Sequence, residues 1–124
     1  MAKHNEVGKS GEDIACEYLE QKGYQIVERN FRRPYGEIDI VAREKGGLLV
    51  FVEVKTVSYE TTSEYRPEDN IHPYKLRRLG NTIQAYLASK RHSGDWRLDV
   101  LAIYLNPSTK QAKIRHLEDV VIGT

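Results

Sequence analysis

Charged residues interrupt two short apolar segments in a pattern that could support metal-dependent chemistry. Asp39 lies within the segment Glu37–Ala42, and Glu53 and Lys55 lie within the segment Leu48–Lys55. The remaining residues of both segments are apolar enough for buried strands, where an ionised side chain needs a partner or a metal ion. Carboxylates are the hard oxygen ligands that Mg²⁺ and Mn²⁺ favour, and such a site suits phosphodiester hydrolysis.

The spacing of the two segments predicts that they pair as a hairpin. The connection Lys45–Gly47 has glycine available for a left-handed position. The resulting register places Asp39 opposite Glu53, with Cβ atoms about 4.5–5.5 Å apart, and a divalent cation between them would reverse their repulsion. It also places Glu37 opposite Lys55, so an ordinary ion pair of Lys55 with Glu37 or Asp39 is an alternative. A shift of one residue would move Asp39 to the other face of the sheet.

Hydrophobic periodicity and turn residues predict the elements that position these side chains. The polar, non-periodic residues 56–72 predict a mobile loop, and residues 1–8 are polar enough to be disordered. The order α-β-β-β-α-β-β in one domain of 124 residues predicts an α/β protein with a mixed central sheet flanked by helices. In chain order, we expect a helix from Ser10 to Gly23, strands at Tyr24–Phe31, Glu37–Ala42 and Leu48–Lys55, a helix from Pro73, and strands at Trp96–Tyr104 and Ala112–Leu117.

The overall composition fits a soluble globular protein. Hydrophobic residues make up 40% and charged residues 30% of the chain, with a net charge of +1. The single cysteine, Cys16, excludes an internal disulfide, and its helical apolar position predicts a buried thiol. We find no apolar run of membrane-spanning length and no signal-peptide core, so we expect a cytoplasmic protein.

Asp99 is a further acidic residue inside an apolar segment, the strand expected at Trp96–Tyr104. We interpret it either as a group that supports the acidic site or as a buried ion-pair partner. The histidines have no mutual metal-ligand spacing, and we interpret all of them as incidental; they are His4, His72, His92 and His116.

Two motifs together resemble the core of the PD-(D/E)xK nuclease superfamily. They are Gly36–Ala42 and Phe51–Thr56. More narrowly, the chain resembles the YraN-like family, a largely uncharacterised group of small bacterial proteins related to archaeal Holliday junction resolvases. The resemblance runs from Gly8 to Asp99 and includes Gly11–Ala15 and Arg97–Val100. It implies a restriction-endonuclease-like fold.

The resemblance also implies roles for individual residues. Asp39 and Glu53 would be ligands of Mg²⁺ or Mn²⁺, and Lys55 would be the catalytic lysine. Glu12 would be a further catalytic acid, reaching the metal directly or through water, although an acid in the first turn of a helix can simply complement the helix dipole. Apart from the resemblance, the backbone carbonyl of Val54 is a natural further ligand.

Basic residues near these segments are candidates for contacts with a nucleic-acid backbone, although a solvated surface is their ordinary role. They are Arg32, Arg33, Lys75 and Arg78. We therefore expect a metal-dependent DNA endonuclease, a phosphodiester hydrolase, acting on branched, flapped or single-stranded DNA. The alternative is a non-catalytic nucleic-acid-binding or partner-docking module that keeps the nuclease fold. Cutting both strands of a duplex needs two active sites or two successive cuts, which is compatible with a homodimer.

Overall fold

The computed structural model has the predicted order of helices and strands. It describes residues 2–58, 73–106, 108–109 and 111–121, so most of the loop predicted over residues 56–72 lies outside the described residues. The observed order confirms the predicted α-β-β-β-α-β-β arrangement of a mixed α/β protein. The elements are α1 (Ala2–Gln21), β1 (Gln25–Arg33), β2 (Gly36–Arg43), β3 (Leu49–Ser58), α2 (Pro73–Ser89), β4 (Trp96–Leu105) and β5 (Ala112–Leu117).

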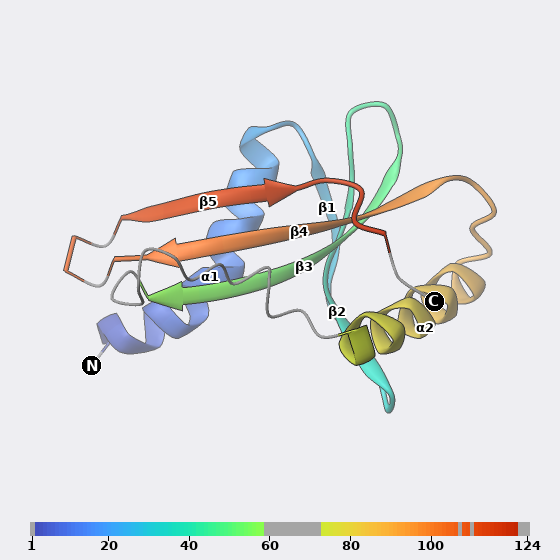
Figure 1. The fold of residues 1–124 in the computed structure, drawn as a ribbon. Helices are drawn as coiled ribbons and strands as arrows, with labels where there is room; N and C mark the ends of the chain where they lie inside the picture. Colours follow the sequence, from blue (N-terminus) through green and yellow to red (C-terminus); the bar gives the residue numbers. More distant parts are fainter. Residues whose placement is uncertain (1, 59–72, 107, 110, 122–124) are drawn as a thin grey trace.

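The strands form one five-stranded sheet in the order β1-β2-β3-β4-β5. β3 and β4 are parallel, whereas the other neighbouring strands are antiparallel. A parallel pair needs a long crossover connection, and α2 lies in that connection. Figure 1 shows that the tip of the β1–β2 hairpin extends past α2 at the lower right of the molecule. This arrangement brings the start of α2 close to the acidic segments of β2 and β3.

The two helices cover opposite faces of the sheet. Because side chains alternate along a strand, Val50 and Val52 of β3 belong to the core beneath α1, whereas Leu49 and Phe51 belong to the core beneath α2. Cys16 is part of the α1 core and is 7% exposed, which confirms the predicted buried thiol. Burial raises the pKa of this thiol.

Several element boundaries differ from those predicted. The helix α1 begins at Ala2, so Ser10 lies inside it and does not cap its start. Gly11 is buried where α1 meets β3, and a Cβ atom there would collide with the hydroxyl of Thr56. β3 continues past its predicted end at Lys55 to Ser58, because parallel pairing with β4 gives the polar residues Thr56 and Ser58 ladder partners. No helix in the described ranges is both long and apolar enough to cross a membrane.

Candidate active site

The β2–β3 hairpin has the predicted register, and its ladder ends beside the two acidic residues. The last ladder pair is Ile40–Val52. One step further along the same register, Asp39 faces Glu53. The carboxylates therefore lie where the two strands stop pairing, which leaves space for their side chains to approach one another.

The Asp39 carboxylate accepts a hydrogen bond that a backbone carbonyl of β2 would accept if the ladder continued. Hydrogen-bonded pairs alternate along an antiparallel ladder, and Glu44 N–H donates to the Leu48 carbonyl at 2.9 Å. The alternation would therefore direct Val54 N–H to the carbonyl of Ile38. It donates instead to Asp39 Oδ2 at 2.8 Å. In such a pair the N–H and C=O of a residue face the same neighbouring strand, so the alternation also directs the Val54 carbonyl toward β2.

The two carboxyl groups perturb one another strongly. Burial, followed by the negative charge of Glu53 and its hydrogen bond, raises the pKa of Asp39 to about 8, although Val54 N–H acts in the opposite direction. Glu53 is 3% exposed, and its Oε2 atom has no hydrogen-bond donor among the described residues. A buried carboxylate beside a half-buried one is a suitable binding site for a cation.

Lys75, in the first turn of α2, forms an ion pair with Glu53. Its Nζ atom lies 2.5 Å from Glu53 Oε2, although the angles do not make this ion pair a hydrogen bond. The Lys75 side chain is 49% exposed, whereas that of Glu53 is almost fully buried. The sequence predicts Lys75 as a phosphate-contacting residue, and the structure shows that it also reaches a predicted metal ligand.

Lys55 lies on the same face of β3 as Glu53 and is half-buried. No hydrogen bond or ion pair to another described residue holds its ammonium group. Glu37, which the hairpin register would place opposite Lys55, instead bonds to Arg32 at 3.1 Å. The ladder between β2 and β3 has ended before Glu37, whereas β1, on the other edge of β2, still pairs there and places Arg32 opposite Glu37. The predicted Glu37–Lys55 pairing is therefore wrong.

Glu12 contacts β1, although its charge still acts on the site. Its Oε1 atom accepts hydrogen bonds from Arg29 Nε at 3.3 Å and from Asn30 Nδ2 at 3.0 Å. Its negative charge contributes to the raised pKa of Asp39. Within the described ranges, no three acidic, histidine or cysteine side chains are arranged to hold a metal. The donor set fits an ion that takes two carboxylates and a carbonyl and completes its shell with water, as Mg²⁺ commonly does.

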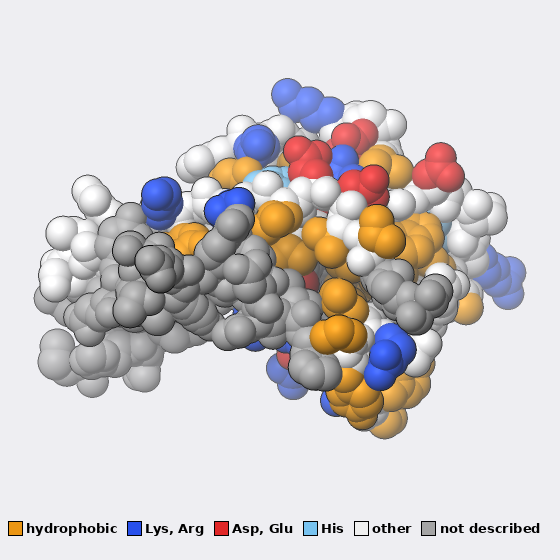
Figure 2. Space-filling model, viewed as in Figure 1, with side chains coloured by type: hydrophobic (Ala, Val, Ile, Leu, Met, Phe, Trp, Pro, Cys, Tyr) orange, Lys and Arg blue, Asp and Glu red, His pale blue; other side chains and the backbone are white. Residues whose placement is uncertain are grey.

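A pocket of about 500 Å³ adjoins Glu53 between the tip of the β1–β2 hairpin and α2. Arg78 Nε donates to the Tyr35 carbonyl at 2.7 Å, which ties the hairpin to the helix. Hydrophobic side chains reach the surface around the hairpin tip and α2 at the lower right of Figure 2. All of the basic residues predicted to contact nucleic acid line this pocket; they are Arg32, Arg33, Lys75 and Arg78.

Comparison with known proteins identifies the family of the chain. The family model described as uncharacterised protein family UPF0102 matches residues 11–103. The chain belongs to the UPF0102 family. A UPF0102 protein of Flavobacterium psychrophilum is 40% identical over 119 residues, which cover 96% of both chains. One from Thermotoga maritima is 42% identical over 115 residues, covering 93% of this chain and 96% of the relative.

Membership of UPF0102 confirms the predicted YraN-like family. A more distant member, from Desulforamulus reducens, is 33% identical over 117 residues and is covered over 94% of its length. The relatives and this chain therefore share nearly their full length. Because the family description names no activity, the function of this UPF0102 protein has to be argued from its site.

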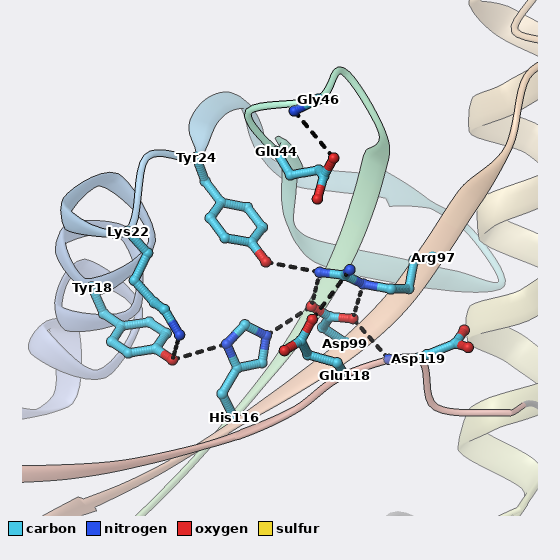
Figure 3. Close-up of polar contacts among 10 residues, drawn as sticks. All are labelled: Tyr18, Lys22, Tyr24, Glu44, Gly46, Arg97, Asp99, His116, Glu118 and Asp119. Carbon is cyan, nitrogen blue, oxygen red and sulfur yellow. Dashed lines mark hydrogen bonds and ion pairs between the residues drawn. The ribbon is translucent and has the colours of Figure 1, made fainter.

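A second polar cluster of this UPF0102 protein is centred on Asp99, which is fully buried. Arg97 donates to both carboxylate oxygens, at 2.8 and 2.9 Å, and Asp119 N–H donates at 3.0 Å. His116 Nε2 donates at 2.7 Å, and its Nδ1 atom lies 2.9 Å from the hydroxyl of Tyr18 (Figure 3). Burial alone would raise the pKa of Asp99, but hydrogen bonds from His116 and Arg97 hold it below its usual value.

This cluster decides between the two interpretations of Asp99, which is a buried ion-pair partner. It also shows that the interpretation of His116 as incidental is wrong. The sequence signal for Asp99 was a charge inside an apolar strand. His116 had no comparable signal, because only the antiparallel pairing of β4 with β5 brings it beside Asp99.

Proposed function

We propose that this protein is a Mg²⁺- or Mn²⁺-dependent DNA endonuclease that hydrolyses phosphodiester bonds in branched, flapped or single-stranded DNA. The observation that supports this most strongly is the close pair of Asp39 and the buried Glu53 beside a basic pocket. The acids require a cation, and the basic residues attract phosphate. A site that processes phosphate esters uses both features together.

Each residue of the site has a distinct role in this proposal. The carboxylates of Asp39 and Glu53, together with the Val54 carbonyl, would hold the metal, and Glu12 would act on it through water. The bound ion would polarise a water molecule and neutralise phosphate charge. The ammonium group of Lys55, on the same strand face as Glu53, orients the attacking water and stabilises negative charge on the phosphate.

The pocket beside the site supports a nucleic-acid substrate with unpaired bases. Arg32, Arg33 and Arg78 offer planar guanidinium groups that suit the phosphate backbone. Tyr74 also lines the pocket and is 55% exposed, and Tyr35 at the hairpin tip is 43% exposed. Exposed aromatic rings beside basic residues are typical platforms for unpaired bases.

The second candidate is a non-catalytic nucleic-acid-binding or partner-docking module. The ion pair between Lys75 and Glu53 favours it, because this ion pair neutralises the buried acid without a metal. A module of this kind would keep the basic pocket and bind DNA but would not cut it.

Cleavage of labelled DNA tests the proposal directly. We expect single-stranded, flapped or four-way-junction DNA to be cut with Mg²⁺ or Mn²⁺, and Lys55→Ala to lower the rate by about 10²-fold or more. Lys113→Ala, which removes an exposed lysine from β5, is the matched control and should cut normally. Binding without cutting by the wild type would support the non-catalytic module.

Thermal unfolding provides a test of metal binding that does not depend on activity. Mn²⁺ should raise the melting temperature of the wild type, because an ion that binds only the folded state stabilises it. Asp39→Asn should abolish this increase while keeping an oxygen that can accept the Val54 N–H. An equal increase in both proteins would place the metal elsewhere.

A further inference from the structure

Lys75 occupies a position that the helix itself does not favour. It follows Pro73, the first residue of α2, by only two positions, and no acidic residue lies in the first turn. A cation at a helix N-terminus is destabilised by the positive end of the helix dipole. The compensating interaction is with Glu53, whose Oε2 atom lies 2.5 Å from the Lys75 ammonium group.

Without Lys75, the buried carboxylate of Glu53 would have no ion-pair partner among the described residues. Leaving a buried carboxylate without a partner is costly, and in the metal-free protein the ion pair with Lys75 supplies the opposite charge beside Glu53. Because Glu53 is 3% exposed, a metal ion and an ammonium group cannot both readily approach the same oxygen from solvent.

We propose that Lys75 holds the cation position of the metal-free site, and that a divalent ion binds by displacing it into the adjacent pocket. This inference rests on the metal site of the proposed function. The Lys75 side chain is already half-exposed and has a flexible four-carbon stem, so it can leave the carboxylate while the helix stays in place. Glu53 is buried and does not need to move.

The displaced ammonium group would remain beside the predicted phosphate-binding residues. Lys75 lines the same pocket as Arg32, Arg33 and Arg78. Metal binding would therefore release one more positive charge to the pocket, at the edge nearest to the acids. In this way the charge that neutralises Glu53 in the metal-free protein becomes available to bind a phosphate when the metal is present.

Amine labelling followed by mass spectrometry tests the displacement in the wild-type protein. We expect Mn²⁺ to increase the labelling rate of Lys75 severalfold while the exposed Lys113, on β5, is unaffected. In the Glu53→Gln variant, Lys75 should be labelled rapidly even without metal. If Mn²⁺ binds and the labelling of Lys75 does not change, the displacement is refuted, but the metal site stands.

Calorimetric titration with Mn²⁺ tests the competition. Removing a charge that competes directly with the ion should strengthen binding, so Lys75→Met should lower the Kd by about tenfold or more. Arg78→Met removes a charge from the same pocket without touching Glu53, and it should change the Kd much less. Equal or weaker binding by Lys75→Met would overturn the inference. Absence of binding by both the wild type and Lys75→Met would overturn it together with the metal site of the proposed function.

Discussion

Replacing Asp99 by asparagine should strongly destabilise the protein, because it removes the charge at the centre of the buried cluster. The carboxylate accepts two hydrogen bonds from Arg97, one from His116 and one from the backbone of Asp119. The asparagine side chain would be nearly the same size, but its NH₂ group would face donors that need an acceptor. The Arg97 side chain is only 15% exposed and would be left without its principal partner.

Removing one partner of a buried ion pair typically costs about 3–5 kcal/mol, and we expect a loss in that range. The free energy of unfolding of a domain is about 5–15 kcal/mol, so the variant should still fold. Urea unfolding can be followed by fluorescence of the only tryptophan, Trp96, whose ring packs edge-to-face on Phe51. Midpoint and slope together give the free energy of unfolding.

The exposed pair of Arg32 and Glu37 offers a matched control. Its side chains are 72% and 49% exposed, and its 3.1 Å contact is similar in length to those of Asp99. Glu37→Gln should therefore cost less than about 1 kcal/mol. An equally small loss for Asp99→Asn would refute the argument that burial makes the Asp99 cluster stabilising. Adding Arg97→Met to Asp99→Asn should recover part of the loss, because the largely buried guanidinium group that has lost its Asp99 partner would then be absent.

The acidic site, the core and the basic pocket can each be tested separately. In EDTA, the pKa of Asp39 of about 8 means that folded protein keeps a proton that the unfolded chain releases. The free energy of unfolding of the wild type should thus fall by up to about 1.4 kcal/mol per pH unit from about pH 4 to 8. If urea unfolding gives the same pH dependence for wild type and Asp39→Asn, this prediction is contradicted. Phe51→Ala removes a buried ring that contacts Tyr86 and Trp96 and should cost about 3–5 kcal/mol in urea unfolding; a loss below about 1 kcal/mol would contradict this packing. Arg78→Gln should reduce the salt dependence of DNA binding, measured by fluorescence anisotropy, by about one phosphate contact, and an unchanged slope would place Arg78 outside the interface.

The order of elements and the register of the β2–β3 hairpin could be predicted from the amino-acid sequence, because both depend on local information. The connection Lys45–Gly47 is short, and strand alternation then specifies which residues face one another. The predicted approach of Asp39 and Glu53 follows from this register. The buried position of Cys16 could be predicted equally well, because it depends on the periodicity of one helix.

The charges that meet across the sheet could be identified only from the folded protein. Lys75 reaches Glu53 because the crossover between the parallel strands β3 and β4 places the start of α2 beside β3. The pairing of β4 with β5 likewise brings His116 to Asp99. These partners come from separate elements, and no spacing in the chain encodes their approach. The physical reason is that a long-range contact depends on how whole elements pack, whereas register within a hairpin depends only on a few neighbouring residues.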